Sequence, residues 1–230
     1  MISEDISRSS ISYKAPYRAR FVADVAMFFR IAFQFWRGFH FLRNTKRAVT
    51  IFGSARTPDD HPHCKIAFEV AREIGKHGIA IVTGGGGAIM QASNRGALAA
   101  GVPSIGINIE IPKEQQPNPY LTHSLKCRYF FVRKVLLCRY SEAFIALPGG
   151  VGTLDELFEI VTLIQTGKMK NRPLVLVHRE FWEGMLKWMR EVLIPEGMIH
   201  QSDYDRLIVV DTAEEVVAAL FKPELKAEGK

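Results

Sequence analysis

A glycine-rich segment between two apolar runs is the first place where this sequence could do chemistry. Residues 148–156 read Pro-Gly-Gly-Val-Gly-Thr-Leu-Asp-Glu. The run before them, 143–147, predicts a buried strand, and the run after them, 157–164, predicts an amphipathic helix. Backbone N–H groups at a strand–loop–helix junction face outward and attract an anion. The segment therefore predicts a phosphate site, with the carboxylate of Glu156 beside it.

The same residues have a purely structural interpretation. Thr153 and Glu156 are spaced as T-x-x-E, the pattern of a capping box in which the glutamate only bonds back to the start of its own helix. These residues alone leave both interpretations open.

Another glycine segment, Gly84–Gly87, comes earlier in the chain and follows the predicted strand 79–83; in chain order it is the first glycine segment and 148–156 is the second. It lacks the G-x-G-x-x-G spacing of dinucleotide sites, and Asn108 stands where such sites place an acid at the end of the next strand. A Walker lysine pattern is also missing. Together the two segments favour a mononucleotide or a sugar phosphate over NAD or ATP. The alternative for Gly84–Gly87 is a tight strand-to-helix turn.

Arg133 and Lys134 supply cations close in sequence to the glycine segment 148–156. They lie in a predicted helix over 130–140, directly before the strand 143–147. By spacing alone, a solvated basic helix face is the favoured interpretation of this pair.

Strands and helices alternate from Arg47 onward, which predicts an α/β fold with a doubly wound parallel sheet covered on both faces. Ligands of such sheets bind at the carboxyl ends of the strands. The residues 110–124 are expected to form a long loop. Further predicted strands cover 48–53, 103–109, 173–178 and 207–211; further predicted helices cover 66–77, 89–100, 180–194 and 213–221.

Charge is unevenly distributed along the 230 residues. The first 47 residues hold nine Lys/Arg and three Asp/Glu, whereas the remaining residues hold 21 of each. The net charge of +6 therefore belongs to the N-terminal extension. A neutral domain argues against nucleic acid as its partner.

The N-terminal extension is predicted to be a tail followed by an aromatic amphipathic helix over 19–43. Its arginines and Asp24 argue against a membrane span. Three roles remain: packing on the domain or across a dimer, which is favoured, lying on a membrane surface, or targeting. The apolar positions with helical spacing are Val22, Val25, Phe29, Ala32, Trp36, Phe39 and Leu42.

Three scattered cysteines, Cys64, Cys127 and Cys138, are too few for a disulfide framework or a metal site. They are typical of a reducing compartment, so a cytoplasmic location is expected. The predicted organisation is a tail and helix over 1–46, one domain over 47–222 and a C-terminal tail over 223–230.

Several segments together resemble one known family. They are the glycine segment 148–156, Ile51–Arg56, Thr83–Gly86 with Ile89-Met90, Asn94–Ala97, Gly106–Pro112, Tyr129–Lys134 and Leu163–Lys168. This combination is similar to the LOG ("lonely guy") family of cytokinin riboside 5′-monophosphate phosphoribohydrolases, formerly labelled lysine decarboxylases. The resemblance covers roughly residues 28–222, and it is closest to a bacterial branch that carries an N-terminal helix.

The resemblance implies a Rossmann-like single domain that works as a homodimer or higher oligomer. It implies hydrolysis of the N-glycosidic bond of a nucleoside 5′-monophosphate, with no metal or organic cofactor. A binding module without turnover is the alternative. The residues that correspond to the family's sites are Arg133 and Glu156 as the catalytic pair, Gly149, Gly150, Gly152 and Thr153 as the phosphate loop, and Gly84, Gly85, Gly86, Met90 and Lys134 as further substrate contacts.

The sequence departs from the branch at the first glycine loop. Gly87-Ala88 replaces the usual Pro-Gly, and Gln91 replaces a glutamate. These changes put recognition of the base or ribose in question and leave the phosphate anchor intact. In the N-terminal helix, Gln34 and Arg37 stand where acids are common, which could alter the contacts of an oligomer.

Overall fold

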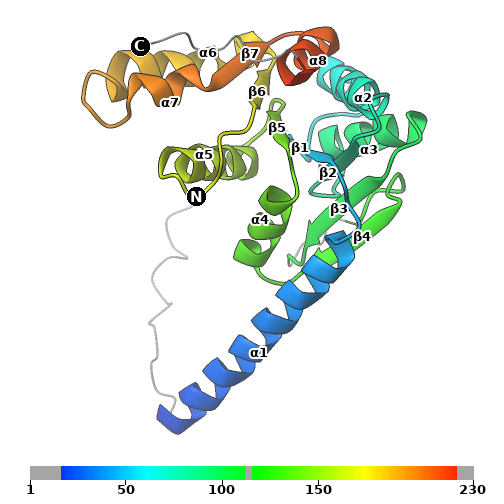
Figure 1. Ribbon diagram of the computed structural model, residues 1–230, viewed down its shortest axis with the longest axis vertical. Helices are drawn as coiled ribbons and strands as arrows, with labels where there is room; N and C mark the ends of the chain where they lie inside the picture. The colour runs from blue at the N-terminus through cyan, green and yellow to red at the C-terminus, as the bar shows by residue number, and fades with distance from the viewer. Residues whose placement is uncertain (1–16, 112–115, 222–230) are drawn as a thin grey trace, which may run out of the picture.

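The computed structural model describes residues 17–111 and 116–221, and residues 17–20 by their backbone alone (Figure 1). The parts of the predicted tails before residue 17 and after residue 221 fall outside the described residues. All seven strands pair in parallel, in the order β4-β3-β2-β1-β5-β6-β7. The predicted α/β class and parallel sheet are confirmed. The strands are β1 (Ala48–Phe52), β2 (Ala80–Thr83), β3 (Ser104–Ile109), β4 (His123–Cys127), β5 (Ala143–Ala146), β6 (Leu174–Val177) and β7 (Leu207–Val210).

The central strands are buried throughout because helices cover both faces of the sheet. One face packs on α2 (Pro62–Gly75), α3 (Ile89–Ala99) and α8 (Ala213–Phe221). The other face packs on α4 (Phe130–Arg139), α5 (Val151–Gln165) and α6 (Arg179–Trp188). The remaining helices are α1 (Tyr17–Leu42), a π-helix (Met189–Leu193) that continues α6, and α7 (Gln201–Asp205).

The sequence interpretation missed β4: its first two residues fall in the predicted loop 110–124, and its other three were assigned to no element. This strand lies at the edge of the sheet, and only Leu125 and Cys127 of its five residues are buried. A short, mostly polar edge strand has no continuous apolar run, so the signal that predicted the central strands is absent here. Pairing with β3, from Ile105–His123 to Ile109–Cys127, defines it instead.

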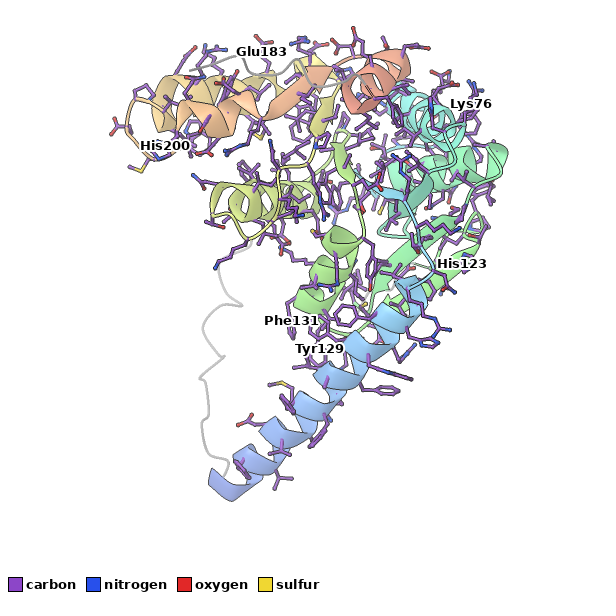
Figure 2. The ribbon with its side chains drawn as sticks, viewed as in Figure 1. Lys76, His123, Tyr129, Phe131, Glu183 and His200 are labelled. Carbon is purple, nitrogen blue, oxygen red and sulfur yellow. The ribbon has the colours of Figure 1, made fainter. Side chains whose placement is uncertain are left out.

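The helix α1 leaves the domain as a long rod, and its C-terminal half contacts α4 (Figures 1 and 2). Gln34 Oε1 accepts a hydrogen bond from Tyr129 N at 3.3 Å, and the Phe35 and Phe131 rings lie 6.4 Å apart. The predicted apolar stripe is largely exposed, with Val22 66% and Phe29 65% exposed. Within the stripe, Leu42 is buried against the domain and the Phe39 ring lies under Arg139 of α4, so only the C-terminal end of the stripe packs on the domain.

No helix in the described ranges combines the length and the apolar character needed to cross a membrane.

Candidate active site

The two glycine segments meet at the carboxyl edge of the sheet, on either side of β1. The first follows β2 and the second follows β5, and β1 pairs with both strands. The strand order runs outward in opposite directions from β1 and from β5. The gap between these two strands is therefore the topological switch point, where open α/β sheets bind ligands.

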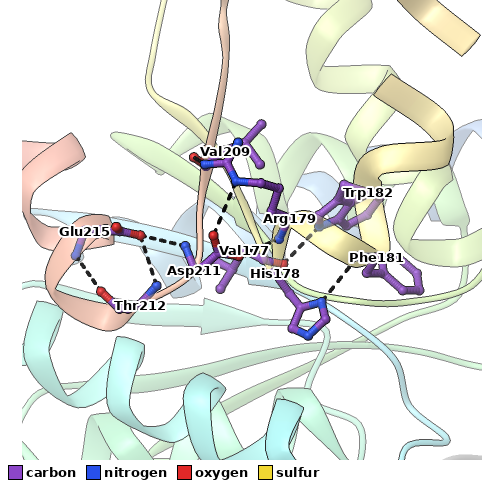
Figure 3. A network of polar contacts seen from close by, with 9 residues as sticks. All are labelled: Val177, His178, Arg179, Phe181, Trp182, Val209, Asp211, Thr212 and Glu215. Carbon is purple, nitrogen blue, oxygen red and sulfur yellow. Dashed lines mark hydrogen bonds and ion pairs between the residues drawn. The ribbon is translucent and has the colours of Figure 1, made fainter. Parts of the chain in front are cut away.

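Helix starts along this edge differ in how they are capped. In α6, His178 Nδ1 accepts from Phe181 N, and at α8 the Glu215 carboxylate accepts from Asp211 N and Thr212 N (Figure 3). In contrast, α3 and α5, the helices that follow the glycine segments, have no side-chain cap. The first amide groups of a helix have no partner within it. In α5 the Thr153 and Leu154 amides already donate to the Gly150 carbonyl, so the amides of Val151 and Gly152 are the ones available to a ligand.

A cavity of about 420 Å³ lies at this point. The volume and the lining of this cavity suit a small phosphorylated ligand better than a dinucleotide. Its walls come from the ends of β1 and β2, from α4 and from the start of α5. The lining residues are Phe52, Gly53, Ser54, Ala55, Arg56, Gly84, Met90, Arg133, Gly150, Val151, Gly152, Thr153 and Glu156.

Arg133 and Glu156 meet in the wall of this cavity. Arg133 Nη1 donates to Glu156 Oε1 at 3.2 Å, and Arg133 Nε donates to the carbonyl of Ile107 at 2.8 Å. The side chains are 15% and 6% exposed. The solvated basic face favoured for Arg133 is thus wrong: β3 anchors the guanidinium and α5 supplies its counter-ion.

The second carboxylate oxygen, Glu156 Oε2, is buried and has no hydrogen-bond partner among the described residues. Burial raises the pKa of Glu156 to about 7, against the opposing effect of the Arg133 charge. A buried carboxyl with a pKa near neutrality and a free oxygen is typical of a general acid or base. Burial also lowers the pKa of Arg133, opposed by Glu156.

The start of α5 decides between the two interpretations of Thr153 and Glu156. The N-cap is Gly150 and the helix begins at Val151, six residues before the predicted start at Leu157. Thr153 is therefore the third helical residue and cannot cap the helix for Glu156. The capping box is excluded, because Glu156 bonds across to α4 instead.

The second glycine segment lies against the cavity as predicted for a phosphate loop. Gly150, Gly152 and Thr153 line it, while Gly149 packs behind them against the Thr153 side chain. Thr153 is 5% exposed.

The first glycine segment is built around Arg133. A side chain at Gly84 would collide with the Arg133 guanidinium, so only glycine lets the loop pass this closely. Gly85 has φ +71°, and its carbonyl accepts from Asn108 Nδ2 at 3.1 Å. The Gly86 carbonyl accepts from Asn118 Nδ2 at 2.9 Å. Gly84 and Met90 line the cavity, whereas Gly85 and Gly86 hold the loop in place.

Lys134 points away from the cavity. Its Nζ lies 2.8 Å from Asp155 Oδ1 and 3.1 Å from Glu159 Oε2, on the outer side of α5. Burial lowers the pKa of Lys134, but the bonds to Asp155 and Glu159 outweigh this and raise it overall. The structure therefore does not bring this predicted substrate contact to the other site residues.

Two cavity features escaped the site prediction made from the sequence. Arg56 and Ser54, in the loop after β1, line the cavity. The Gly-Ser pair at the end of the strand 48–53 was a signal of a loop at the sheet edge, but nothing in it indicated that Arg56 would face the second glycine segment. Within the described ranges, no cluster of three or more His, Cys, Asp or Glu is placed to hold a metal ion.

Comparisons with known proteins identify the family of the chain. A family model described as "Possible lysine decarboxylase" matches residues 90–220. A cytokinin riboside 5′-monophosphate phosphoribohydrolase of Rhodococcoides fascians is 30% identical over 188 residues, covering 79% of this chain and 92% of that relative. The enzyme of the same name from Mycobacterium tuberculosis is 31% identical, covering 72% of this chain and 89% of its own.

Solved structures share the fold. The structural genomics target TM1055 has a TM-score of 0.56 at 24% identity, over 74% of this chain and 96% of that one. The molybdenum cofactor carrier protein of Chlamydomonas reinhardtii has a TM-score of 0.54 at 21% identity, over 76% and 95%. The sequence matches go further than the fold: the chain belongs to the family that contains the cytokinin riboside 5′-monophosphate phosphoribohydrolases.

Proposed function

We propose that the protein hydrolyses the N-glycosidic bond of a nucleoside 5′-monophosphate, such as AMP or a cytokinin riboside monophosphate, to free base and ribose 5-phosphate. The observation that carries this proposal is the unpartnered, buried oxygen of Glu156 beside Arg133, in a cavity that also holds the uncapped start of α5. The activity named for the relatives from R. fascians and M. tuberculosis agrees with that chemistry.

The phosphate binds at the start of α5, where the amide groups of Val151 and Gly152 have no partner within the helix and Thr153 adds a hydroxyl. Holding the ester away from the broken bond orients the sugar, so that binding energy is used at C1′. Gly84 and Met90, which line the cavity beside Arg133, contact the rest of the nucleotide.

Bond cleavage leaves the glycosidic electron pair on the base nitrogen and an oxocarbenium-like sugar. The ionised carboxylate of Glu156 stabilises that cation and accepts a proton from the attacking water, whose oxygen becomes the C1′ hydroxyl. Arg133 holds one oxygen of this carboxylate with a planar, permanently charged group and leaves the other free. The released base takes up one proton, so the reaction consumes one water.

The test is a panel of purine and pyrimidine nucleoside 5′-monophosphates, each paired with its nucleoside, with released base quantified by chromatography. Release from monophosphates and much slower release from nucleosides is the expected result. A protein that binds AMP tightly yet releases no base from any of them would instead be the binding module considered from the sequence.

We further propose that the working unit is a homodimer or a higher homo-oligomer. Large apolar side chains of α1 and α4 are exposed next to one another. Together they form a larger exposed apolar surface than a helix surrounded by water usually has. Phe29 and Trp36 on α1 are 65% and 61% exposed, and Phe130 at the start of α4 is 54% exposed. Light scattering is expected to give at least twice the chain mass, and Phe29→Glu with Trp36→Glu should reduce it; a monomeric wild type would refute this part.

Three free, buried cysteines agree with a cytoplasmic location, which we also propose. Fractionation of the native host, with the protein recovered outside the cytoplasmic fraction, would contradict it.

A further inference from the structure

We propose that Arg56 binds the 5′-phosphate of the substrate and supplies the positive charge that the phosphate loop lacks. This inference rests on the proposed function, since it names a further binding residue of the same site.

The charge balance of the cavity leads to Arg56. A phosphate ester carries between one and two negative charges at neutral pH, and Glu156 lies in the same cavity. The start of a helix contributes only about half a positive charge. Among the described residues that line the cavity, Arg56 and Arg133 are the cationic ones.

Arg133 already has two hydrogen-bond partners. Its Nε bonds to the Ile107 carbonyl at 2.8 Å and its Nη1 to Glu156 at 3.2 Å. Turning it toward a phosphate would leave the Glu156 carboxylate buried without a counter-ion. Lys134 is likewise held by Asp155 and Glu159, outside the cavity.

Arg56 is exposed at the rim, and the part of the chain that the structure describes shows no ion pair for it. It lines the cavity together with Gly150, Gly152 and Thr153. A guanidinium in this place can bind two phosphate oxygens at once with a planar fork of donors.

The loop that carries Arg56 is fixed to the glycine segment 148–156 and to the start of α3. Ser54 N donates to the Pro148 carbonyl at 3.0 Å, and Ile89 N donates to the Ser54 carbonyl at 3.2 Å. The Ser54 hydroxyl accepts from the backbone amides of Arg56 and Thr57 at 3.0 and 3.2 Å. The backbone of Arg56 is therefore held in one position relative to the start of α5, which lowers the entropic cost of using its side chain.

The experiment measures binding and turnover separately. Calorimetry with ribose 5-phosphate reports phosphate binding without any reaction, and steady-state hydrolysis of AMP reports KM and kcat. Arg56→Ala should weaken ribose 5-phosphate binding and raise KM for AMP by about ten- to a hundredfold, the scale of one charged hydrogen-bonding group. Because the Glu156 pair is untouched, kcat should change by less than about threefold.

Arg56→Lys should recover part of the affinity, since it restores the charge and loses the fork. The matched control is Arg95→Ala, another exposed arginine that stacks over Phe68 and is outside the lining of the cavity; it should leave both quantities unchanged. Unchanged ribose 5-phosphate affinity in Arg56→Ala would overturn the assignment. If wild type binds ribose 5-phosphate through Arg56 but releases no base from AMP, this inference stands and the proposed hydrolysis fails.

Discussion

Two neighbouring groups of ion pairs join α4 to α5, and they differ in burial and in position relative to the cavity. Arg133 and Glu156 are buried, and one carboxylate oxygen is left free in the cavity. Lys134 bridges Asp155 and Glu159 on the outer side of α5, where Asp155 is 52% exposed. Arg133 is next in sequence to Lys134, and Glu156 is next to Asp155. From this difference we propose that the first pair takes part in chemistry and that the second group holds the two helices together.

Removing the two carboxylates separately is the sharpest way to break this comparison. Glu156→Gln should lower base release by at least about a hundredfold, the scale of a lost general base. Asp155→Asn, its neighbour in sequence, should stay within a few-fold of wild type. Both rates come from the same chromatographic assay. Equal losses in the two variants would mean that the pairs do not differ in function.

The cations allow a second contrast. Arg133→Lys keeps the charge but loses the bidentate geometry that reaches both Ile107 and Glu156, so we expect turnover to fall by about tenfold or more. Lys134→Met should leave turnover near wild type and lower the free energy of unfolding by at most about 1 kcal/mol, because its main partner is half exposed. Turnover and urea unfolding of both variants provide the test. Loss of activity in Lys134→Met would mean that Lys134 does contact the substrate, as the family resemblance implies.

The raised pKa of Glu156 gives the pair a pH signature. If the ionised form is the active base, kcat/KM should rise with pH and level off above about 7. The residual activity of Glu156→Gln should lack this limb, whereas Asp155→Asn should retain it. If kcat/KM instead levels off above about pH 4.5, the Glu156 carboxylate has the pKa of a carboxylate in water, which contradicts its burial in the cavity wall.

The same shift affects stability. Burial makes the folded protein hold the Glu156 proton more tightly than the unfolded chain does. Its contribution is therefore complete below about pH 4.5, and it is lost as pH rises through about 7. Wild type should lose thermal stability relative to Glu156→Gln between pH 5 and 8. A constant difference in Tm across that range would contradict the shift.

A smaller effect tests the loop that packs on Arg133. Ala88 has φ 54° and ψ −121°, a conformation that suits glycine, and glycine is the residue that the resembling branch has there. Ala88→Gly should raise the free energy of unfolding by about 1 kcal/mol, since relief of strain exceeds the added freedom of the unfolded chain. Urea unfolding measures it, with Ala99→Gly in the same helix, expected to be destabilising, as the control. A destabilised Ala88→Gly would mean that this backbone is unstrained.

Sequence pattern was sufficient where one signal dominated. The buried strands β1, β2 and β5 are continuous apolar runs, and the glycines that follow two of them mark the edge of the sheet that holds the cavity. Pairing Arg133 with Glu156 needed the family resemblance, because the contact joins two helices across 23 residues of sequence. The sequence pattern of α1 indicated an apolar stripe, but most of that stripe is exposed, and the contacts with α4 also use Gln34 and Phe35, which lie outside it.

Other features depend on long-range packing and had no local signal. The strand β4 exists because it pairs with β3, not because of its own composition. The early start of α5 follows from the turn at Gly150 and moves Thr153 out of the capping position. Arg56 reaches the cavity only because its loop bonds to both Pro148 and Ile89.

The most direct test of the account is the product balance of one reaction. AMP is incubated with the wild-type protein, and adenine, ribose 5-phosphate, adenosine and inorganic phosphate are all quantified. Cleavage at C1′ predicts adenine and ribose 5-phosphate in equal amounts, with neither adenosine nor inorganic phosphate. Release of adenosine with inorganic phosphate, or no product at all from a protein that binds AMP, would contradict the role given to Arg133 and Glu156.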